Sequence, residues 1–141
     1  MLDLIDTKGK KDIKSMTLEE VTVEMTALGE KSFRAKQLYD WLHVKLADDF
    51  DEMTNLSKAL REKLEENYEI LPVVMLERQI SKIDGTNKFL FRLYDGNVVE
   101  SVLMKYKHGN SVCISTQVGC RMGCRFCAST VGGLIRSLKT S

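Results

Sequence analysis

Proline, tryptophan and histidine are scarce in this sequence, and long apolar runs are missing from it. Its 141 residues include one proline, one tryptophan and two histidines. No stretch of about eighteen or more apolar residues occurs, which excludes an apolar membrane-spanning helix. The N-terminus mixes charged residues with isolated apolar ones, unlike the basic and apolar regions of a signal peptide. We therefore expect a cytoplasmic protein without a membrane partner, whose cysteines stay reduced.

Acidic residues are absent from the C-terminal part of the chain. Residues 1–100 hold 15 Lys and Arg against 20 Asp and Glu, whereas residues 101–141 hold six basic residues and no acidic one. A segment of one charge sign suits an anionic ligand, such as a carboxylate or a nucleic-acid phosphate. The same charges could instead only solvate surface loops. Composition leaves both interpretations open.

Three of the four cysteines are concentrated in one short stretch. Cys120, Cys124 and Cys127 have the spacing C-x3-C-x2-C. Such a loop can direct three thiolates at one metal centre, and one coordination position then has no protein ligand. A structural zinc site normally has four protein ligands. Zinc bound by these cysteines with His108 as the fourth ligand, or thiols that bind nothing, remain the alternatives.

This spacing, with Phe126 directly before the last cysteine, resembles the cluster loop of the radical S-adenosylmethionine (SAM) enzymes. The resemblance implies a 4Fe-4S cluster held by Cys120, Cys124 and Cys127. It also implies that SAM chelates the fourth iron and that Phe126 lies near the adenine of SAM. Enzymes of this superfamily build a partial (β/α)6 barrel after the loop, but only fourteen residues follow Cys127. We therefore expect the N-terminal portion of a longer enzyme.

The N-terminal half shows helical patterns. The first fifteen residues lack an apolar period and predict a loose lead-in. The run from Thr17 to Glu20 is a capping box, which predicts a helix that ends at Gly29. Ser32 is predicted to cap a second helix that reaches about Lys45 and buries one face, made of Phe33, Leu38, Trp41 and Leu42. A third helix is predicted from Ser57 to about Tyr68.

After Pro72 the pattern changes to the alternation that is typical of strands. Asp-Gly turns at Asp84 and Asp95, and a turn at 108–110, separate four predicted strands over 74–82, 88–94, 98–105 and 111–116, which form an antiparallel meander. Gly132 and Gly133 are expected to form a hinge before a helix. The predicted fold is thus an α+β fragment: a three-helix accessory domain (1–71), an antiparallel β linker (72–110), and the first strand and cluster loop of a truncated partial (β/α)6 radical SAM barrel (111–141).

Longer motifs narrow the resemblance to one family. The runs V-V-E-S-V-L-M, from Val98, and S-V-C-I-S-T-Q-V-G-C-R-M-G-C-R-F-C-A-S-T, from Ser111, closely resemble the RlmN-type adenine-C2 RNA methyltransferases. The Cfr-type enzymes, which act at C8, are close relatives of that family. The helical runs S-F-R-A-K-Q-L-Y-D-W-L and D-E-M-T-N-L-S-K-A-L-R resemble its accessory domain. The likeness covers the chain from about Thr17 onward.

The resemblance implies a methyltransferase that acts on C2 of adenine in 23S rRNA and in tRNA, works as a monomer and takes electrons from a donor such as flavodoxin. One SAM methylates an enzyme cysteine, which lies downstream of this chain, and a second SAM supplies a radical that removes hydrogen from that methyl group. The resulting methylene adds to adenine. Because the downstream cysteine and the SAM-binding segments have no counterpart here, we expect no turnover by this chain alone.

Two further residues take catalytic roles by the same resemblance. Cys113 matches a second cysteine that releases the covalent RNA adduct through a transient disulfide, although an isolated strand cysteine is often a small buried apolar residue. Glu100 matches the proton acceptor. Strand alternation places it on one face with Val98, Val102 and Met104, so we expect apolar surroundings that suit proton transfer; a salt bridge is the alternative. A cluster-free RNA-binding module or a zinc-bound small domain remain the alternative functions.

Overall fold

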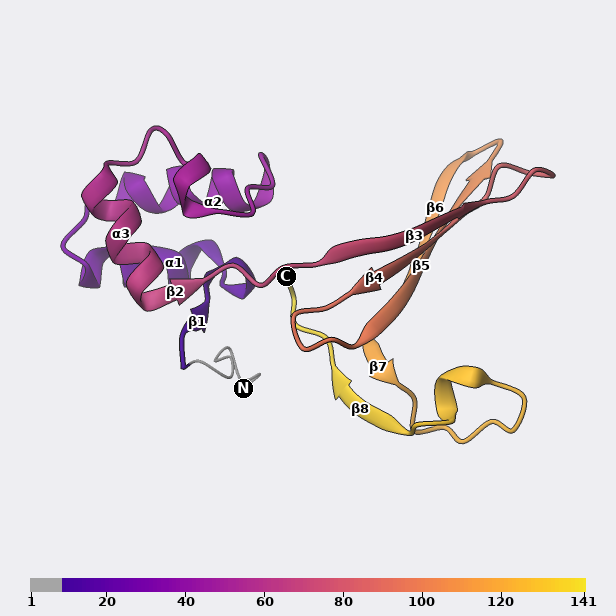
Figure 1. Ribbon diagram of the computed structural model, residues 1–141. Helices are drawn as coiled ribbons and strands as arrows, with labels where there is room; N and C mark the ends of the chain where they lie inside the picture. The colour runs from indigo at the N-terminus through magenta and orange to yellow at the C-terminus, as the bar shows by residue number, and fades with distance from the viewer. Residues whose placement is uncertain (1–8) are drawn as a thin grey trace. The chain divides into compact units, whose positions relative to one another are not determined.

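The computed structural model describes residues 9–141, which form two compact units (Figure 1). One unit contains residues 9–71 and 139–141, and the other contains Pro72–Leu138. No helix within this described range combines the length and apolar character needed to cross a membrane. The fold is mixed, with three α-helices and a four-stranded antiparallel sheet, as the sequence predicts. The predicted boundaries between accessory domain, linker and radical SAM core stay predictions. Strand β6 (Gly109–Ile114) crosses the boundary predicted after residue 110.

The first unit is built on three helices and several short elements. In chain order these are β1 (Lys11–Asp12), η1 (Ile13–Ser15), α1 (Leu18–Ala27), α2 (Ser32–His43), η2 (Phe50–Glu52), α3 (Lys58–Asn67) and β2 (Tyr68–Glu69). Helix α1 starts with the predicted capping box: the Glu20 amide donates to the Thr17 hydroxyl (3.3 Å) and the Thr17 amide donates to the Glu20 carboxylate (2.7 Å). Gly29, at φ 81°, follows its last turn as predicted.

Helix α2 differs from its prediction at its N-terminal end. Ser32 is the first helical residue, and the N-cap is Lys31, whose side chain makes no capping hydrogen bond. Leu38 and Leu42 are fully buried, whereas Phe33 is 51% exposed and has the Arg34 guanidinium 5.0 Å above its ring. A helix advances about 100° per residue, so Phe33 is turned well away from the stripe of these two leucines. The prediction of a buried Phe33 is therefore wrong.

The predicted loose lead-in is wrong where the structure describes it; residues 1–8 lie outside the described residues. Asp12 and Ile13 are fully buried. Strand β1 pairs in parallel with β2, with Lys11 opposite Tyr68. The buried Asp12 carboxylate accepts hydrogen bonds from the Ser15 hydroxyl (2.6 Å) and from a backbone amide, so its polar atoms are satisfied. The many charged residues of this segment suggested a solvated tail, but Ile13 belongs to the hydrophobic core.

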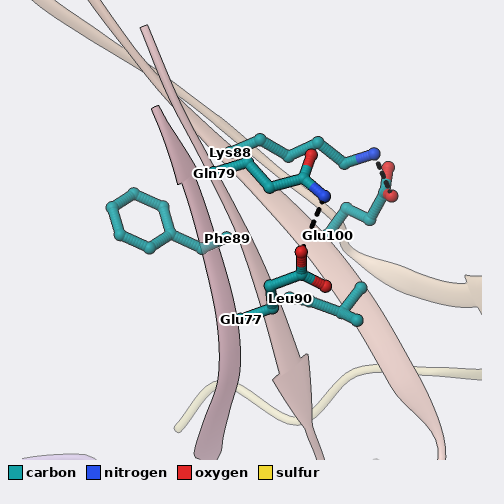
Figure 2. A pocket seen from close by; sticks show the side chains of 6 residues that line it. All are labelled: Glu77, Gln79, Lys88, Phe89, Leu90 and Glu100. Carbon is teal, nitrogen blue, oxygen red and sulfur yellow. Dashed lines mark hydrogen bonds and ion pairs between the residues drawn. The ribbon is translucent and has the colours of Figure 1, made fainter. Parts of the chain in front are cut away.

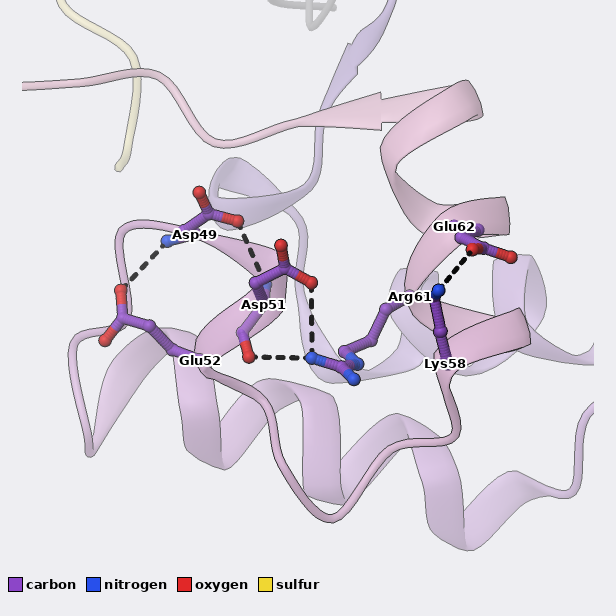
Figure 3. A network of polar contacts seen from close by, with 6 residues as sticks. All are labelled: Asp49, Asp51, Glu52, Lys58, Arg61 and Glu62. Carbon is purple, nitrogen blue, oxygen red and sulfur yellow. Dashed lines mark hydrogen bonds and ion pairs between the residues drawn. The ribbon is translucent and has the colours of Figure 1, made fainter.

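A polar network connects the acidic segment around η2 to α3 (Figure 3). Asp49 caps η2 by accepting from the Asp51 amide at 2.9 Å, and Glu52 accepts from the Asp49 amide at 3.2 Å. Arg61 of α3 donates to the backbone oxygen of Asp51 (2.7 Å) and pairs with its carboxylate (3.2 Å). The carboxylates of this segment therefore cap and crosslink the backbone.

The second unit contains a four-stranded antiparallel sheet in the order β3 (Val74–Ile80), β4 (Asn87–Arg92), β5 (Val98–Tyr106) and β6 (Gly109–Ile114). The predicted meander is confirmed. Gly85 and Gly96 have φ of 70° and 82° in the two Asp-Gly turns, a region that favours glycine. The Asp95 turn sets the register of β4 against β5, in which Leu90 lies opposite Glu100.

Two more strands flank the cysteine motif. Strand β7 (Gln117–Gly119) pairs in antiparallel fashion with β8 (Leu134–Ser137), and the short η3 (Ala128–Thr130) lies between them. The helix predicted after Gly133 is therefore wrong, because a strand follows. A run of four residues is too short for its period to distinguish helix from strand. Its pairing with β7 decides the outcome.

Candidate functional site

The cysteine motif forms the loop between β7 and β8. The loop is closed at its base, where the Cys120 amide donates a hydrogen bond to the carbonyl oxygen of Gly133 at 3.1 Å. Gly119 directly precedes it with a φ of 74°. Cys120 is therefore the first residue of the loop, which extends over residues 120–133 between the two paired strands.

Thr130 organises the part of the loop that carries the other two cysteines. Its hydroxyl lies 2.9 Å from the carbonyl oxygen of Cys124 and 2.8 Å from that of Cys127. The Cys127 amide also donates to the Cys124 carbonyl at 3.1 Å. These hydrogen bonds hold the backbone of the second and third cysteines in one turn, so Thr130 is a supporting residue that cysteine spacing did not reveal.

The donor chemistry of the loop fits an iron–sulfur cluster. Cys120, Cys124 and Cys127 are half-buried free thiols on one loop, and three thiols leave one iron of a four-iron cluster open. Within residues 9–141, however, no three Cys, His, Asp or Glu side chains are gathered closely enough to share a metal ion. His108, the fourth ligand of the zinc alternative, stacks on Tyr106 in the turn after β5, with ring centroids 5.1 Å apart.

Phe126 is the aromatic residue of the loop, and its side chain is almost fully exposed. Its exposed fraction is 94%, and that of Met122 is 75%. An aromatic ring this open contributes nothing to the core of the described structure, so its free face can stack on a planar ligand. This agrees with the position expected for a residue beside an adenine ring, which stays a prediction.

Glu100 has polar surroundings on β5 (Figure 2). Its side chain is 55% exposed, and its carboxylate pairs with the Lys88 ammonium of β4 at 2.6 Å. Val98, on the same face, is also exposed. The expectation of apolar surroundings is therefore wrong, and the salt-bridge alternative describes the structure. Sheet register explains the ion pair: although the residue directly opposite Glu100 is Leu90, Lys88 is its diagonal neighbour on the same face.

Cys113 lies on β6, exposed, opposite Val102 of β5. Alternation along β5 places Val102 and Glu100 on one face, so Cys113 and Glu100 share that face. Two serine hydroxyls tie these strands together: Ser101 donates to the Cys113 carbonyl at 3.0 Å and Ser115 donates to the Glu100 carbonyl at 2.8 Å. The exposure of Cys113 contradicts the alternative that it is a small buried apolar residue. All four cysteines are free thiols, including Cys113.

A pocket of about 380 Å³ connects Glu100 with the base of the cysteine loop. Its lining includes Glu100 and Val98 of β5, Ser115 after β6, Gly119 at the end of β7, and Ser129 in the loop. The residue assigned to proton transfer and the loop assigned to the cluster thus border one cavity. The pocket is large enough for a group of several heavy atoms.

Arg136, in the basic segment, has an acidic partner. Arg136 of β8 pairs with Asp95 at 2.6 Å and lies 5.0 Å above the ring of Tyr94. Burial disfavours the charged form of Asp95, but hydrogen bonds from Arg136 and Asn97 outweigh this effect and lower its pKa to about 2. Arg121 and Arg125, in the loop, are exposed and have no ion-pair partner among residues 9–141. Their charge is available to an anionic ligand.

The sequence patterns did not predict Lys88 as the ion-pair partner of Glu100. The signal was present, because the Asp95 turn fixes which residues of β4 and β5 are opposite each other. That register makes Lys88 a same-face diagonal neighbour of Glu100. Pairing the residues of β4 and β5 outward from the Asp95 turn predicts this contact.

Comparison with known proteins gives consistent matches. Residues 11–70 match the family described as the ribosomal RNA large subunit methyltransferase N-terminal domain, RlmN_N. The chain is 70% identical over 94% of its length to a protein of Lachnoclostridium phytofermentans, and 65% identical over 92% to one of Lachnospira eligens. Both are named "Probable dual-specificity RNA methyltransferase RlmN", and this chain spans 37% of each.

A solved structure shares the fold. A radical SAM methyltransferase from Sphaerobacter thermophilus superposes with a TM-score of 0.77 at 39% identity. The match covers 90% of this chain and 37% of that one. Sequence and fold thus agree over nearly the whole chain, which corresponds to just over a third of the length of its relatives.

Proposed function

We propose that this chain supplies the accessory domain, the proton acceptor and the cluster loop of a radical SAM RNA methyltransferase of the RlmN family. The match of residues 11–70 to the family model and the 70% identity to one relative support this proposal. The proposed substrate is C2 of adenine in 23S rRNA and in tRNA. The proposed enzyme contains a partial (β/α)6 barrel that the cluster loop begins, acts as a monomer and takes electrons from a donor such as flavodoxin.

The observation that carries the proposal is the placement of its residues in one unit. Glu100 and Cys113 share one face of the β5–β6 ladder, and Glu100 borders the same pocket as the base of the cysteine loop. Proton removal acts on C2 of adenine, and adduct release acts on the methylene carbon that joins C2 to the enzyme sulfur. A mechanism of this type therefore requires its base and its thiol to be near each other, which this arrangement supports.

In the proposed mechanism Cys120, Cys124 and Cys127 would hold a 4Fe-4S cluster, and the exposed ring of Phe126 would be available to stack on the adenine of SAM. When bound, the cluster and SAM supply a 5'-deoxyadenosyl radical. Glu100 takes the proton from C2 of the covalently joined adenine. Cys113, as a thiolate, attacks the sulfur that links enzyme and RNA: a sulfur–sulfur bond forms and the carbon–sulfur bond breaks. The electron pair of that bond stays with the methylene carbon on the adenine, which takes a proton from solvent to become the methyl group.

The experiment uses this chain joined at its C-terminal end to the remainder of the 70% identical relative; we call this protein the extended enzyme. Anaerobic reconstitution with iron and sulfide should give a visible chromophore, SAM cleavage to 5'-deoxyadenosine, and methyl groups on C2 of adenine in 23S rRNA. RNA binding without a chromophore would favour a cluster-free RNA-binding module. Stoichiometric zinc with no iron uptake would favour a zinc-bound domain.

A further inference from the structure

Lys88 makes the closest polar contact to the proposed proton acceptor. Its ammonium lies 2.6 Å from the Glu100 carboxylate, and both side chains are about half-exposed. Exposed ion pairs are often interchangeable surface contacts. In this pair the strand register fixes the positions of both residues.

The two residues are held on one face by ladders on both sides of β4. In one cross-strand row Glu77, Leu90 and Glu100 are opposite one another, and in the next row Gln79 lies opposite Lys88. Lys88 is therefore a diagonal neighbour of two carboxylates, one on β3 and one on β5. The ammonium has a choice of partner, and it pairs with Glu100.

A neighbouring amide explains this choice (Figure 2). The Gln79 side chain donates a hydrogen bond to the Glu77 carboxylate at 2.8 Å, so the competing carboxylate already has a donor. All of these side chains, with Leu90, line a small pocket of about 230 Å³ beside Glu100. Phe89 points to the opposite side of the strand in the same view. Gln79 therefore bonds to Glu77, and the Lys88 ammonium pairs with Glu100.

A proton acceptor needs this kind of neighbour. The Glu100 carboxylate must keep its oxygens in place, because a base misplaced by about 1 Å loses much of its effect. When Glu100 takes the proton from C2, the ring keeps the electron pair, and the neutral acid is bound less strongly by the ammonium. The proton can then leave to solvent.

We propose that Lys88 is a positioning residue, which holds the Glu100 carboxylate ready to accept the C2 proton of the covalently bound adenine. The inference rests on the proposed function, and it concerns one step only. SAM cleavage and formation of the adduct should not depend on Lys88, whereas resolution of the adduct should.

The test uses the extended enzyme with Lys88→Met, which removes the charge and keeps most of the chain length. We expect 5'-deoxyadenosine formation at the unsubstituted rate, accumulation of enzyme covalently attached to RNA, and resolution slowed about tenfold. Glu100→Gln should be slower still, because losing a general base costs roughly a hundredfold or more. Lys88→Arg should restore resolution to within about threefold, since Arg keeps the charge and the donors.

Two controls separate positioning from a merely structural ion pair. Lys82→Met removes an exposed lysine from the turn between β3 and β4, and it should change nothing. The double variant Lys88→Glu, Glu100→Lys keeps an ion pair at the same place. A structural role predicts that this exchange rescues activity, whereas a positioning role predicts normal thermal stability with no resolution of the adduct.

The outcomes distinguish this inference from the proposed function. Normal resolution by Lys88→Met, together with adduct accumulation by Glu100→Gln, would overturn the role of Lys88 and leave Glu100 in place. Normal methylation by Glu100→Gln would overturn the proton-acceptor assignment itself. Rescue by the exchanged pair would make both residues structural.

Discussion

The carbonyl oxygen of Gly133 occupies the space that a side chain on Gly119 would need: a β-carbon there would lie 1.9 Å from it. Gly119 also has a φ of 74°, which residues other than glycine rarely adopt. These glycines stand at the two ends of the cysteine loop, where the Cys120 amide bonds to the same oxygen. Closure of the loop therefore depends on the absence of one methyl group.

Gly119→Ala should open the base of the loop. The clash and the backbone strain together should cost about 3 kcal/mol or more locally, because neither the carbonyl nor the strand can move freely. Hydrogen exchange at the Cys120 amide should become faster, and iron content after reconstitution of the extended enzyme should fall. Gly132→Ala is the matched control, since no atom lies within 4 Å of its added β-carbon and its φ is ordinary. Equal protection of the Cys120 amide in both variants would contradict the closure described here.

Cys124→Ala in the extended enzyme should abolish the chromophore and SAM cleavage, because two thiolates do not hold a four-iron cluster. The first unit should remain folded, since its core is independent of this loop. The measurements are visible absorbance, 5'-deoxyadenosine yield and far-ultraviolet circular dichroism. Cys113→Ala is the control that should keep the chromophore. Undiminished 5'-deoxyadenosine from Cys124→Ala would remove the cluster assignment.

Cys113→Ala should block release of the RNA adduct after normal SAM cleavage. The carbon–sulfur bond has no easy route to break until a second thiol attacks its sulfur. Enzyme joined to RNA should accumulate and appear as a nuclease-sensitive change in gel mobility. Because Cys113 is exposed, its loss should change stability by no more than about 0.5 kcal/mol. Normal methylation without adduct would leave Cys113 without a catalytic role.

Residues 9–71 should melt cooperatively as a separate fragment, whereas residues 17–71 should be much less stable. The shorter fragment lacks the fully buried Ile13 and the nearly buried Met16, whose removal should cost about 2–5 kcal/mol each. Thermal unfolding followed by far-ultraviolet circular dichroism compares the melting temperatures of the two fragments. Equal melting temperatures would show that the segment before α1 does not stabilise this unit.

Stability of the first unit should decrease in acid through Glu24. Burial alone would raise the pKa of Glu24, but hydrogen bonds from Lys11 and Tyr68 outweigh it and lower that pKa below its ordinary value of 4.5. The folded state therefore binds fewer protons than the unfolded state, so this contribution is complete above about pH 4.5 and is lost as pH falls through the folded pKa. Burial and the same carboxylate raise the pKa of Tyr68.

Tyr68→Phe should reduce both this acid sensitivity and stability at pH 7, by about 1.5 kcal/mol for a hydrogen bond to a charged group. Denaturant unfolding of residues 9–71 at pH 7 and at about pH 3 measures both effects. Tyr39→Phe serves as the control, because the Tyr39 ring packs on His43 and its hydroxyl bonds to none of the described residues. An identical acid sensitivity in Tyr68→Phe and the unsubstituted fragment would exclude this linkage.

Local signals determined much of this protein from sequence alone. The capping box at Thr17, the Asp-Gly turns and the cysteine spacing each act within a few residues, so the energies that favour them are present in the sequence itself. They predicted three helices, the meander and the position of the loop. The family resemblance added roles for Glu100 and Cys113 that no local pattern contains.

Tertiary structure decided what depends on residues far apart in the chain. Asp12 and Ile13 look like part of a solvated tail until β2, more than fifty positions later, pairs with β1, which contains Asp12 and directly precedes Ile13. Leu134–Ser137 has no clear period and becomes a strand because β7 offers unpaired backbone groups. Glu100 was expected among apolar neighbours along its own strand, but its surroundings are set by β4, which places Lys88 against it. Side chains on a sheet contact the neighbouring strands, so register determined the environment of Glu100.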